Sequence, residues 1–470
     1  MAPDDAVGQA VQHLRRAGVG GDEMEAWRLA APQDTGAFDA DCARYSQFWR
    51  LSADLLARLP ARPARDPQQA EAAERLKRVA REARKRFLAV HAEAVYDRLT
   101  ANRSRFVRVE QLVYHAAALV PGLTPTREQI ARESAQLQRH KDGHEIDQGI
   151  LVWAILALPG AGGHLCHSML LPRPEALQRL PELEASGRID LGKAEVVRDG
   201  KASIVILKNP RHLNAEDGST IDATEIAVDL AILDPVTEIA LLRGDYVQRG
   251  RYQGRRVLGS GINLTHLYYG KVPYIWYLQR ELGFVHKFYR GLARPEIGPD
   301  DVAGETQEKP WAAVVEGFAI GGHCQYLLTM DHVLAADDAF LTLPARREGI
   351  IPGAANLRLP RFTGDRIAHQ AIMYDRRIDC ASADGRLICD EVVPQSEMDG
   401  AIRRVVERFT TSGMVSATAN RRVFRVAQEP LDLFRRYCAV YALEQAYCHF
   451  SRALISNLER YWNAPDRSPD

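Results

Sequence analysis

Two glycine-containing segments of this chain have the composition of an anion-binding site. "GSGIN" occupies residues 259–263, and "IGGH" occupies residues 320–323 between an apolar run and a helical pattern. Backbone N–H groups at a glycine turn that leads into a helix point toward a negative charge, which the helix dipole also favours. Two such donors stabilise an enolate or a tetrahedral oxyanion when they are fixed where the charge develops. Taken alone, either glycine pair is better explained by a tight turn.

The residues around these glycines are expected to alternate between strands and helices. Such alternation, with short apolar strands, is typical of an α/β core. The expected strands cover residues 202–210, 238–244, 311–317, 332–338 and 339–344, and the expected helices cover residues 220–233 and the segment after Gly322.

The chain on either side of this core is predicted to be helical. In the N-terminal part, the segment 124–137 is predicted to form a helix capped by Thr126, and the segment 70–99 carries an apolar stripe at helical spacing. That stripe consists of Leu76, Val79, Ala83, Phe87, Val90 and Ala94. In the C-terminal part, the helical segment 431–462 has a wide aromatic and aliphatic stripe, which would pack either on its own domain or in a subunit interface. We therefore expect a helical domain over residues 1–190, a core over 191–395 and a C-terminal helical, oligomerisation region over 396–470.

The composition argues against several classes of function. The 61 Lys and Arg residues balance the 61 Asp and Glu residues, so no overall charge favours nucleic acid or a membrane surface. No apolar stretch reaches the roughly 18 residues of a membrane span, and the acidic N-terminus lacks the apolar stretch of a signal peptide. Seven scattered cysteines are typical of a reducing compartment. These features predict a cytoplasmic protein without a nucleic-acid or membrane partner.

The glycine segments and their neighbours together resemble the crotonase (enoyl-CoA hydratase/isomerase) superfamily. The resemblance includes "LKNPRHLNAED" at 207–217, "GSGINLTHL" at 259–267, the long run from Pro310 to Gly364, and "IDCASADGRLICDEVV" at 378–393. It implies an α/β fold with a crotonase (ββα spiral) core, here with a helical N-terminal domain and C-terminal helices. It also implies that Ile262 and Gly322 present the N–H groups that bind the thioester oxygen.

Two positions depart from the pattern of the hydratases in this superfamily. Those enzymes use two glutamates to handle water and a proton, and this chain has Gln325 and Ala345 at the corresponding positions. An amide does not titrate, whereas a glutamate ionises near pKa ~4.3, so ordinary hydration is disfavoured. Glu348 lies one turn beyond Ala345 and is not expected to replace the missing acid.

A closer resemblance covers nearly the whole chain and includes the helical N-terminal region, "GGHCQYLLTMDHV" at 321–333 and "WYLQRELGFVHKFYRGL" at 276–292. It is to superfamily members that act as dioxygenases on an arylacetyl-CoA. The resemblance implies oxidation of 3,5-dihydroxyphenylacetyl-CoA by O₂ to the arylglyoxylate with release of CoA, on the route to dihydroxyphenylglycine and glycopeptide antibiotics. It implies no metal, flavin or other cofactor, and a homo-oligomer, either a trimer or a hexamer.

The same resemblance assigns roles to further polar residues. Arg280 would steady phenolate or peroxide charge, Glu216 would reach the ring hydroxyls, and Gln325 would hydrogen-bond near the reacting carbon. Lys208 and Arg211 flank the expected CoA groove, where they would meet phosphates or remain solvated charges. The group that removes the α-proton stays open, with a substrate phenolate or a bound water as alternatives.

Other activities and ligands fit the sequence less well. The His-rich segments "HKDGHEID" at 140–147 and "GHLCHSM" at 163–169 lack the two-part spacing of a structural zinc site, so no metal is expected. The alternatives are an aryl-CoA thioesterase, another enolate-forming enzyme of the superfamily, and a non-catalytic CoA-binding assembly protein. A shared fold does not decide among them.

Overall fold

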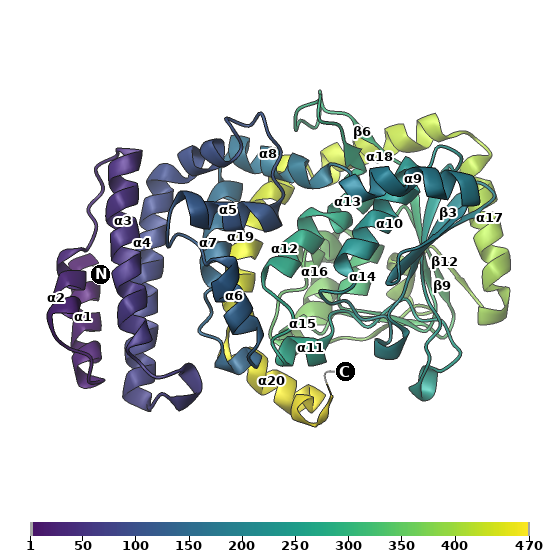
Figure 1. Cartoon of the computed structure of the whole chain (residues 1–470). Helices are drawn as coiled ribbons and strands as arrows, with labels where there is room; N and C mark the ends of the chain where they lie inside the picture. The colour runs from purple at the N-terminus through teal and green to yellow at the C-terminus, as the bar shows by residue number, and fades with distance from the viewer. Residues whose placement is uncertain (1–2, 469–470) are drawn as a thin grey trace.

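The computed structural model of this chain describes residues 3–468. It is elongated, with N-terminal helices at one end and the strands at the other (Figure 1). The N-terminal helices are α1 (Pro3–Arg16), α2 (Asp22–Leu29), α3 (Phe38–Ala57), α4 (Pro67–Leu99), α5 (Val109–Leu119), α6 (Arg127–Ser134), α7 (Ile146–Ala157), α8 (Pro159–Leu170) and α9 (Pro174–Ser186).

The N-terminal helices follow from capping and apolar spacing. The Thr126 hydroxyl accepts a hydrogen bond from the N–H of Gln129 at 3.3 Å, which confirms the predicted cap of α6. On α4 the apolar stripe is buried as far as Phe87, but Val90 is 51% exposed, so its prediction as a core residue is wrong. The buried face continues instead through His91 and Val95.

The core is built on a mixed sheet. Within residues 3–468, seven strands form one sheet in the order β1-β2-β3-β4-β7-β9-β12. The pairs β1–β2 and β2–β3 are antiparallel, and the remaining pairs are parallel. These strands are β1 (Arg188–Asp190), β2 (Ala194–Asp199), β3 (Ala202–Leu207), β4 (Ile239–Gly244), β7 (Trp311–Val315), β9 (His332–Ala336) and β12 (Glu391–Val393).

A second, smaller sheet gives the core its repeating pattern. It contains β8 (Phe318–Ile320), β10 (Phe340–Thr342) and β11 (Ile378–Asp379), and β8 pairs in parallel with β10. The chain passes from β7 in the large sheet to β8 in the small one and then into helix α14 (Gly322–Leu327). It repeats this path through β9, β10 and α15 (Ala345–Glu348). This is the ββα repetition expected from the sequence, and the fold class is confirmed.

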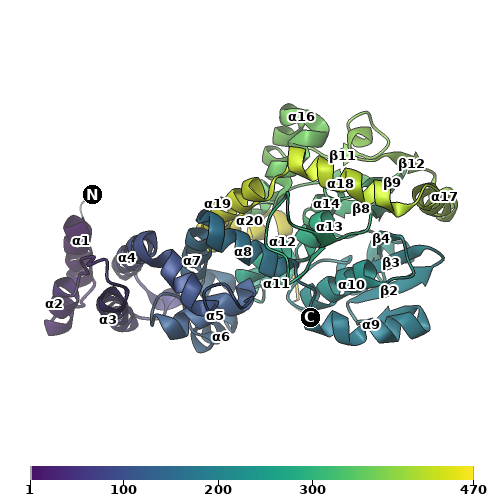
Figure 2. The same cartoon turned by 90° about the horizontal axis from the view of Figure 1, so that it is seen from above.

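Helices cover both faces of the large sheet. Helix α10 packs on β2 and β3, and α17 packs on β4 and β9; Figure 2 shows these two helices on opposite sides of the strands. The remaining helices are α10 (Ile221–Leu233), α11 (Leu264–Tyr268), α12 (Ile275–Leu282), α13 (Phe284–Arg290), α16 (Ala355–Met373), α17 (Met398–Thr410), α18 (Met414–Gln428), α19 (Leu431–His449) and α20 (Arg452–Trp462). A short hairpin pairs β5 (Leu292–Ala293) with β6 (Thr306–Gln307).

The C-terminal helix α19 joins the helical part of the chain to the core. It packs along α7 and α8, and in Figure 1 it passes between these helices and α12. Phe434, Cys438 and Ala442 are buried on this face. The inner side of the apolar stripe on α19 therefore packs within its own chain, which is one of the two alternatives expected from the sequence. A second link between the helical part and the core is the ion pair between Arg108, directly before α5, and Glu225 of α10 (2.8 Å).

Within residues 3–468, no single helix is long and apolar enough to cross a membrane. One pair of helices bent by 111°, Ile146–Ala157 with Pro159–Ser186, meets that test by length and composition only. All seven cysteines of the sequence lie within the described residues and are free thiols.

Candidate active site

The fold brings the two glycine segments together. A Cβ atom on Gly261 would lie 2.9 Å from the carbonyl oxygen of Ile320 and 3.3 Å from the nitrogen of Gly322. A strand-like bridge to Glu216 fixes the neighbouring Ile262. Within residues 3–468, neither the N–H of Ile262 nor that of Gly322 has a hydrogen-bond acceptor. Two unpaired backbone donors therefore lie at adjacent segments, which is the arrangement required to bind an oxyanion.

Gly322 is required at its position by close packing. A Cβ atom there would lie 2.1 Å from Oε2 of Glu216 and 2.8 Å from Nη2 of Arg280. The glycine thus allows the carboxylate and the guanidinium to approach the backbone of the turn. The preceding Gly321 has φ of 54° and ψ of −115°, a conformation that a residue with a Cβ rarely adopts.

Arg280 connects the polar residues of the site. It projects from α12 and is only 3% exposed. Its Nε donates to Oε1 of Glu216 at 2.9 Å, its Nη1 donates to Oε1 of Gln325 at 2.7 Å, and its Nη2 donates to the carbonyl of Gly322 at 2.7 Å. Its Nη1 also donates to Glu281. Burial opposes the charged form, but the neighbouring carboxylates keep the pKa of Arg280 well above its ordinary value.

Glu216 is a buried anion held by several donors. Burial raises the pKa of its carboxyl, but the charges of Arg280 and His323 and the hydrogen bonds from Arg280 and Tyr326 outweigh burial, so the pKa lies below the ordinary value. Tyr326 donates to Oε1, whereas Oε2 is buried and accepts no hydrogen bond within the described residues, its contact with Nδ1 of His323 being 3.9 Å long. A buried, unpaired oxygen of this kind is free to accept a hydrogen bond from a ligand.

His323 is a positioning residue that the sequence reasoning missed. Its Nδ1 accepts a hydrogen bond from the N–H of Gly261 at 3.0 Å. Its ring fills the space that a Cβ on Gly259 would need, since that atom would lie 2.2 Å from Nε2. Burial lowers the pKa of His323 to about 4, so the ring stays neutral and its nitrogen remains an acceptor. In the sequence, its position directly after the glycine pair was the signal that could have indicated this role.

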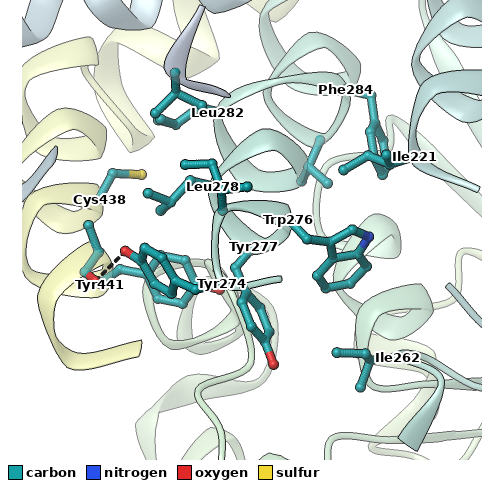
Figure 3. Close-up of a cluster of buried hydrophobic side chains, with 14 of the residues drawn as sticks. Ile221, Ile262, Tyr274, Trp276, Tyr277, Leu278, Leu282, Phe284, Cys438 and Tyr441 are labelled. Carbon is teal, nitrogen blue, oxygen red and sulfur yellow. Dashed lines mark hydrogen bonds between the residues drawn. The ribbon is translucent and has the colours of Figure 1, made fainter. Parts of the chain in front are cut away.

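A small cavity connects these groups. Its volume is about 30 Å³, little more than one water molecule needs, so an aryl group requires movement of its walls. Figure 3 shows Trp276 and Tyr277 on the side of α12 that faces Ile262, whereas Leu278 and Leu282 lie toward Cys438 of α19. The lining residues are Glu216, Ile262, Trp276, Tyr277, Arg280, Glu281, Gly321, Gly322, Gln325, Ala345, Glu348, Ile350, Ile351, Pro352, Gly353 and Tyr441.

Glu348 lies on the cavity wall, and the expectation that it does not replace the missing acid stays a prediction. The sequence reasoning set this residue aside because it lies one turn beyond Ala345, but the structure places both residues on the wall of the same cavity. In the short helix α15, residues three apart share a face. Glu281 also lines the cavity and was not predicted. The positions of Gln325 and Ala345 lack an acid, but the cavity itself contains three carboxylates.

The structure does not bring every predicted residue to this cavity. Ile262, Gly322, Arg280, Gln325 and Glu216 line it, whereas Lys208 and Arg211 do not. Lys208 forms an ion pair with Asp190 at 2.9 Å, and the Arg211 side chain is exposed. The roles of these two residues toward CoA stay predictions.

Neither His-rich segment forms a metal site in the described part of the chain. No group of three or more His, Cys, Asp or Glu residues within residues 3–468 has a metal-binding arrangement. His164 instead hydrogen-bonds to the hydroxyl of Tyr96 at 2.7 Å, and His167 to the carbonyl of Arg294 at 3.0 Å. Whether the protein uses a cofactor stays a prediction.

The family model and a curated relative place this chain in the enoyl-CoA hydratase/isomerase superfamily. Residues 303–437 match the enoyl-CoA hydratase/isomerase family. The chain is 46% identical over 365 residues to the (3,5-dihydroxyphenyl)acetyl-CoA 1,2-dioxygenase of Amycolatopsis orientalis, an alignment that covers 77% of this chain and 82% of that protein. A carnitinyl-CoA dehydratase of Citrobacter koseri is 30% identical over 155 residues, which cover 32% of this chain and 59% of that protein. Among solved structures, an enoyl-CoA hydratase from Bacillus halodurans aligns with a TM-score of 0.47 and 14% identity, covering 57% of this chain and 99% of that one.

Proposed function

The chain belongs to the family of (3,5-dihydroxyphenyl)acetyl-CoA 1,2-dioxygenase within the enoyl-CoA hydratase/isomerase superfamily, and we propose that it catalyses the reaction in that name. The thioester and O₂ become 3,5-dihydroxyphenylglyoxylate and CoA. Both oxygen atoms of O₂ enter the glyoxylate, and C2 is oxidised from a methylene to a ketone. The two hydrogens of C2 leave as protons, one of which ends on the thiol of CoA.

The observation that carries the proposal is the pair of unpaired N–H groups of Ile262 and Gly322 beside the Arg280–Gln325 contact. A thioester oxygen bound by both donors would develop negative charge as C2 loses a proton. The amide of Gln325 stands where a water-handling acid would otherwise protonate or hydrate the enolate. The site is therefore suited to holding an enolate until it reacts with O₂.

The oxidation itself is proposed to need no metal or organic cofactor. The dihydroxyphenyl ring makes the enolate electron-rich, so it passes one electron to O₂ and then combines with the resulting superoxide to form a peroxide at C2. The peroxide attacks the thioester carbonyl and expels CoA. Apolar side chains in the cavity wall, among them Ile350 and Ile351, favour O₂ over water.

Polar residues of the cavity are proposed to bind the rest of the substrate. Glu216 offers its unpaired Oε2 to a ring hydroxyl, and Arg280 balances the charge that develops on the phenolate or peroxide. A planar guanidinium already fixed by Glu216 and Gln325 does this without reorganisation. Lys208 and Arg211 would meet the phosphates of CoA. The product would supply a transaminase that forms dihydroxyphenylglycine for glycopeptide antibiotics.

Chelator-treated protein given the dihydroxyphenylacetyl thioester in aerobic and anaerobic buffer tests the activity, with free CoA and O₂ measured together. O₂-dependent release of CoA with matching O₂ uptake is the expected result. Release of CoA without O₂ would favour the thioesterase, and binding without turnover would favour the non-catalytic CoA-binding protein. Loss of activity on chelation, restored by one metal, would contradict the absence of a cofactor.

We also propose that the protein is a cytoplasmic homo-oligomer, a trimer or a hexamer. Helix α18 supports this, because its outer side carries Val415, Val423 and Phe424, which are 86%, 70% and 60% exposed. Its inner side is basic instead, with Arg421 and Arg425 paired to Glu308. Light scattering of the purified protein should give a multiple of the 52.5 kDa chain. Phe424→Lys should lower that mass, whereas Val302→Lys, at an exposed loop, should not.

A further inference from the structure

In the proposed reaction, a base must remove a proton from the same carbon, C2, in two separate steps. C2 carries two hydrogens in the thioester and none in the glyoxylate. The first proton leaves when the enolate forms. The second leaves C2 when the O–O bond breaks and the ketone forms. A group that accepts a proton, passes it on and accepts another must therefore stand beside C2 throughout the reaction.

Two of the three carboxylates in the cavity are already committed to other partners. Oε1 of Glu216 accepts from Arg280 at 2.9 Å, and Oε1 of Glu281 also accepts from Arg280. The second oxygen of Glu281 accepts from the N–H of Ala354 at 3.2 Å. Both carboxylates are thus engaged by the Arg280 guanidinium, and for Glu216 the charge and hydrogen bond of Arg280 outweigh burial and hold the pKa below its ordinary value, which weakens it as a base.

Glu348 is the remaining carboxylate of the cavity wall. Within residues 3–468 no group donates a hydrogen bond to the Glu348 side chain, and no ion-pair partner lies within 4 Å of it. It shares the inner face of α15 with Ala345, whose small side chain leaves the cavity open on that side. The two oxyanion donors, at Ile262 and Gly322, lie on the same cavity. A thioester bound by them would therefore place its C2 in the space that Glu348 faces.

The charges around Glu348 favour a base that works near neutral pH. Burial raises the pKa of Glu348 to about 7, and Asp375, which follows α16, adds to this, whereas Arg347 on its own helix opposes it. The charge of Glu348 also contributes to the raised pKa of Tyr277, on α12. The other ionisable groups of the cavity wall are Glu216, Arg280, Glu281 and Tyr441. On α20, which packs on α15, the ring of Tyr461 lies under Arg347.

We propose that Glu348 is the catalytic base that removes both protons from C2 of the bound thioester, an inference that rests on the proposed function. In the first step the carboxylate takes a proton from C2, and the C–H electron pair forms the enolate. The carboxylic acid then returns this proton to the thiolate of CoA as the thiolate leaves. The regenerated carboxylate takes the second proton from C2 while the C–H electrons form the ketone and the O–O bond breaks.

Hydrogen exchange at C2 isolates the first of these steps from the chemistry of O₂. The thioester is incubated anaerobically with wild-type protein in D₂O, and loss of the C2 proton signal is followed by NMR. Wild-type protein should exchange C2. Glu348→Gln should slow this exchange by about 100-fold or more, with the dissociation constant of the thioester changed less than twofold. Glu82→Gln, an exposed change on α4, is the matched control.

Three outcomes of this experiment are informative. Exchange by Glu348→Gln at a rate within threefold of wild type would overturn the inference, and so would a wild-type protein that turns over aerobically without exchanging C2. Wild-type exchange without O₂ uptake in aerobic buffer would instead overturn the proposed dioxygenase activity and leave the role of Glu348 as a base intact.

The variant Asp375→Asn gives a readout that a purely structural role for Glu348 would not change. Asp375 has φ of 56°, a conformation that asparagine adopts readily, so the backbone is expected to be retained. Removing this charge lowers the pKa of Glu348, so the acidic limb of the pH profile of the exchange rate should move to lower pH. Asp338→Asn, at an exposed ion pair with Arg255, should leave that limb in place. An unmoved limb in Asp375→Asn would show that another group titrates.

Discussion

The side-chain oxygen of Gln325 accepts a hydrogen bond from Nη1 of Arg280 at 2.7 Å. Because a guanidinium can only donate, the amide must turn its oxygen toward Arg280 and its NH₂ group away from it. Gln325 thereby becomes a neutral donor in a cavity where Arg280 already forms ion pairs with Glu216 and Glu281. The position keeps a hydrogen-bonding side chain in the cavity without adding a third anion to the same guanidinium.

Replacing this amide by an acid should harm the enzyme. Gln325→Glu adds a carboxylate to Arg280 and removes the amide NH₂ donor, so the enolate would form beside an additional negative charge. We expect O₂-dependent CoA release to fall by at least about 10-fold, a loss of roughly 1.4 kcal/mol of transition-state stabilisation. Gln9→Glu is the matched control, because Gln9 also accepts from an arginine, Arg75, but at an exposed site on α1 in the N-terminal helical region. Equal activity of both variants would contradict the role given to Gln325.

A methyl group at Gly322 should disrupt the oxyanion site. In Gly322→Ala the new Cβ would meet Oε2 of Glu216 at 2.1 Å, so either the carboxylate or the turn must move. We expect at least a 100-fold loss of turnover, which is the effect of losing one oxyanion donor. Gly400→Ala in α17 should instead keep full activity, because its nearest neighbour lies at 3.7 Å. Steady-state kinetics of both variants, with circular dichroism to establish folding, make the comparison.

Removing the charge of Arg280 should affect stability as well as turnover. Arg280→Ala leaves Glu216 and Glu281 buried without their counter-charge, which costs about 3–5 kcal/mol of unfolding free energy. Arg280→Lys keeps the charge but cannot reach Glu216, Gln325 and Gly322 together, so it should lose turnover with a smaller loss of stability. Denaturant titrations measure the difference. Arg50→Ala, at the exposed ion pair with Asp54, should change stability by less than about 1 kcal/mol.

Acid should destabilise the protein through its buried histidine. Burial lowers the pKa of His323 from 6.5 to about 4, so below pH 6.5 the unfolded chain binds a proton that the folded chain excludes. The stabilising contribution of the neutral ring is present above pH 6.5 and is lost as the pH falls toward 4, at about 1.4 kcal/mol per pH unit.

Urea titrations between pH 7.5 and 4.5 should show this slope, and His323→Asn should reduce it. The asparagine oxygen is expected to replace Nδ1 as the acceptor for Gly261, so the loop is kept while the titrating group is removed. His369→Asn, at an exposed position on α16, should leave the slope unchanged. A slope that is the same in all three proteins would assign the acid sensitivity to other groups, such as His286 and His449, whose pKa values burial also lowers.

The sequence by itself determined the local structure and the backbone half of the site. Apolar spacing and glycine turns predicted the strands of the core, the helix after Gly322 and the capped helix after Thr126, because these depend on neighbouring residues. The resemblance of the motifs indicated Ile262, Gly322, Arg280, Gln325 and Glu216, and all five line one cavity. It also indicated the superfamily, which the comparisons confirm.

Only the tertiary structure decided which side chains meet across large separations in the chain. Arg280 contacts a residue 64 positions earlier and another 45 positions later, and no local pattern encodes such pairs. The same reason hid His323, which supports a glycine turn 62 residues away. Only the folded chain shows that Glu348, one turn beyond Ala345, lines the same cavity wall. The protonation state of each group followed last, because it depends on burial and on charges that only the folded chain brings together.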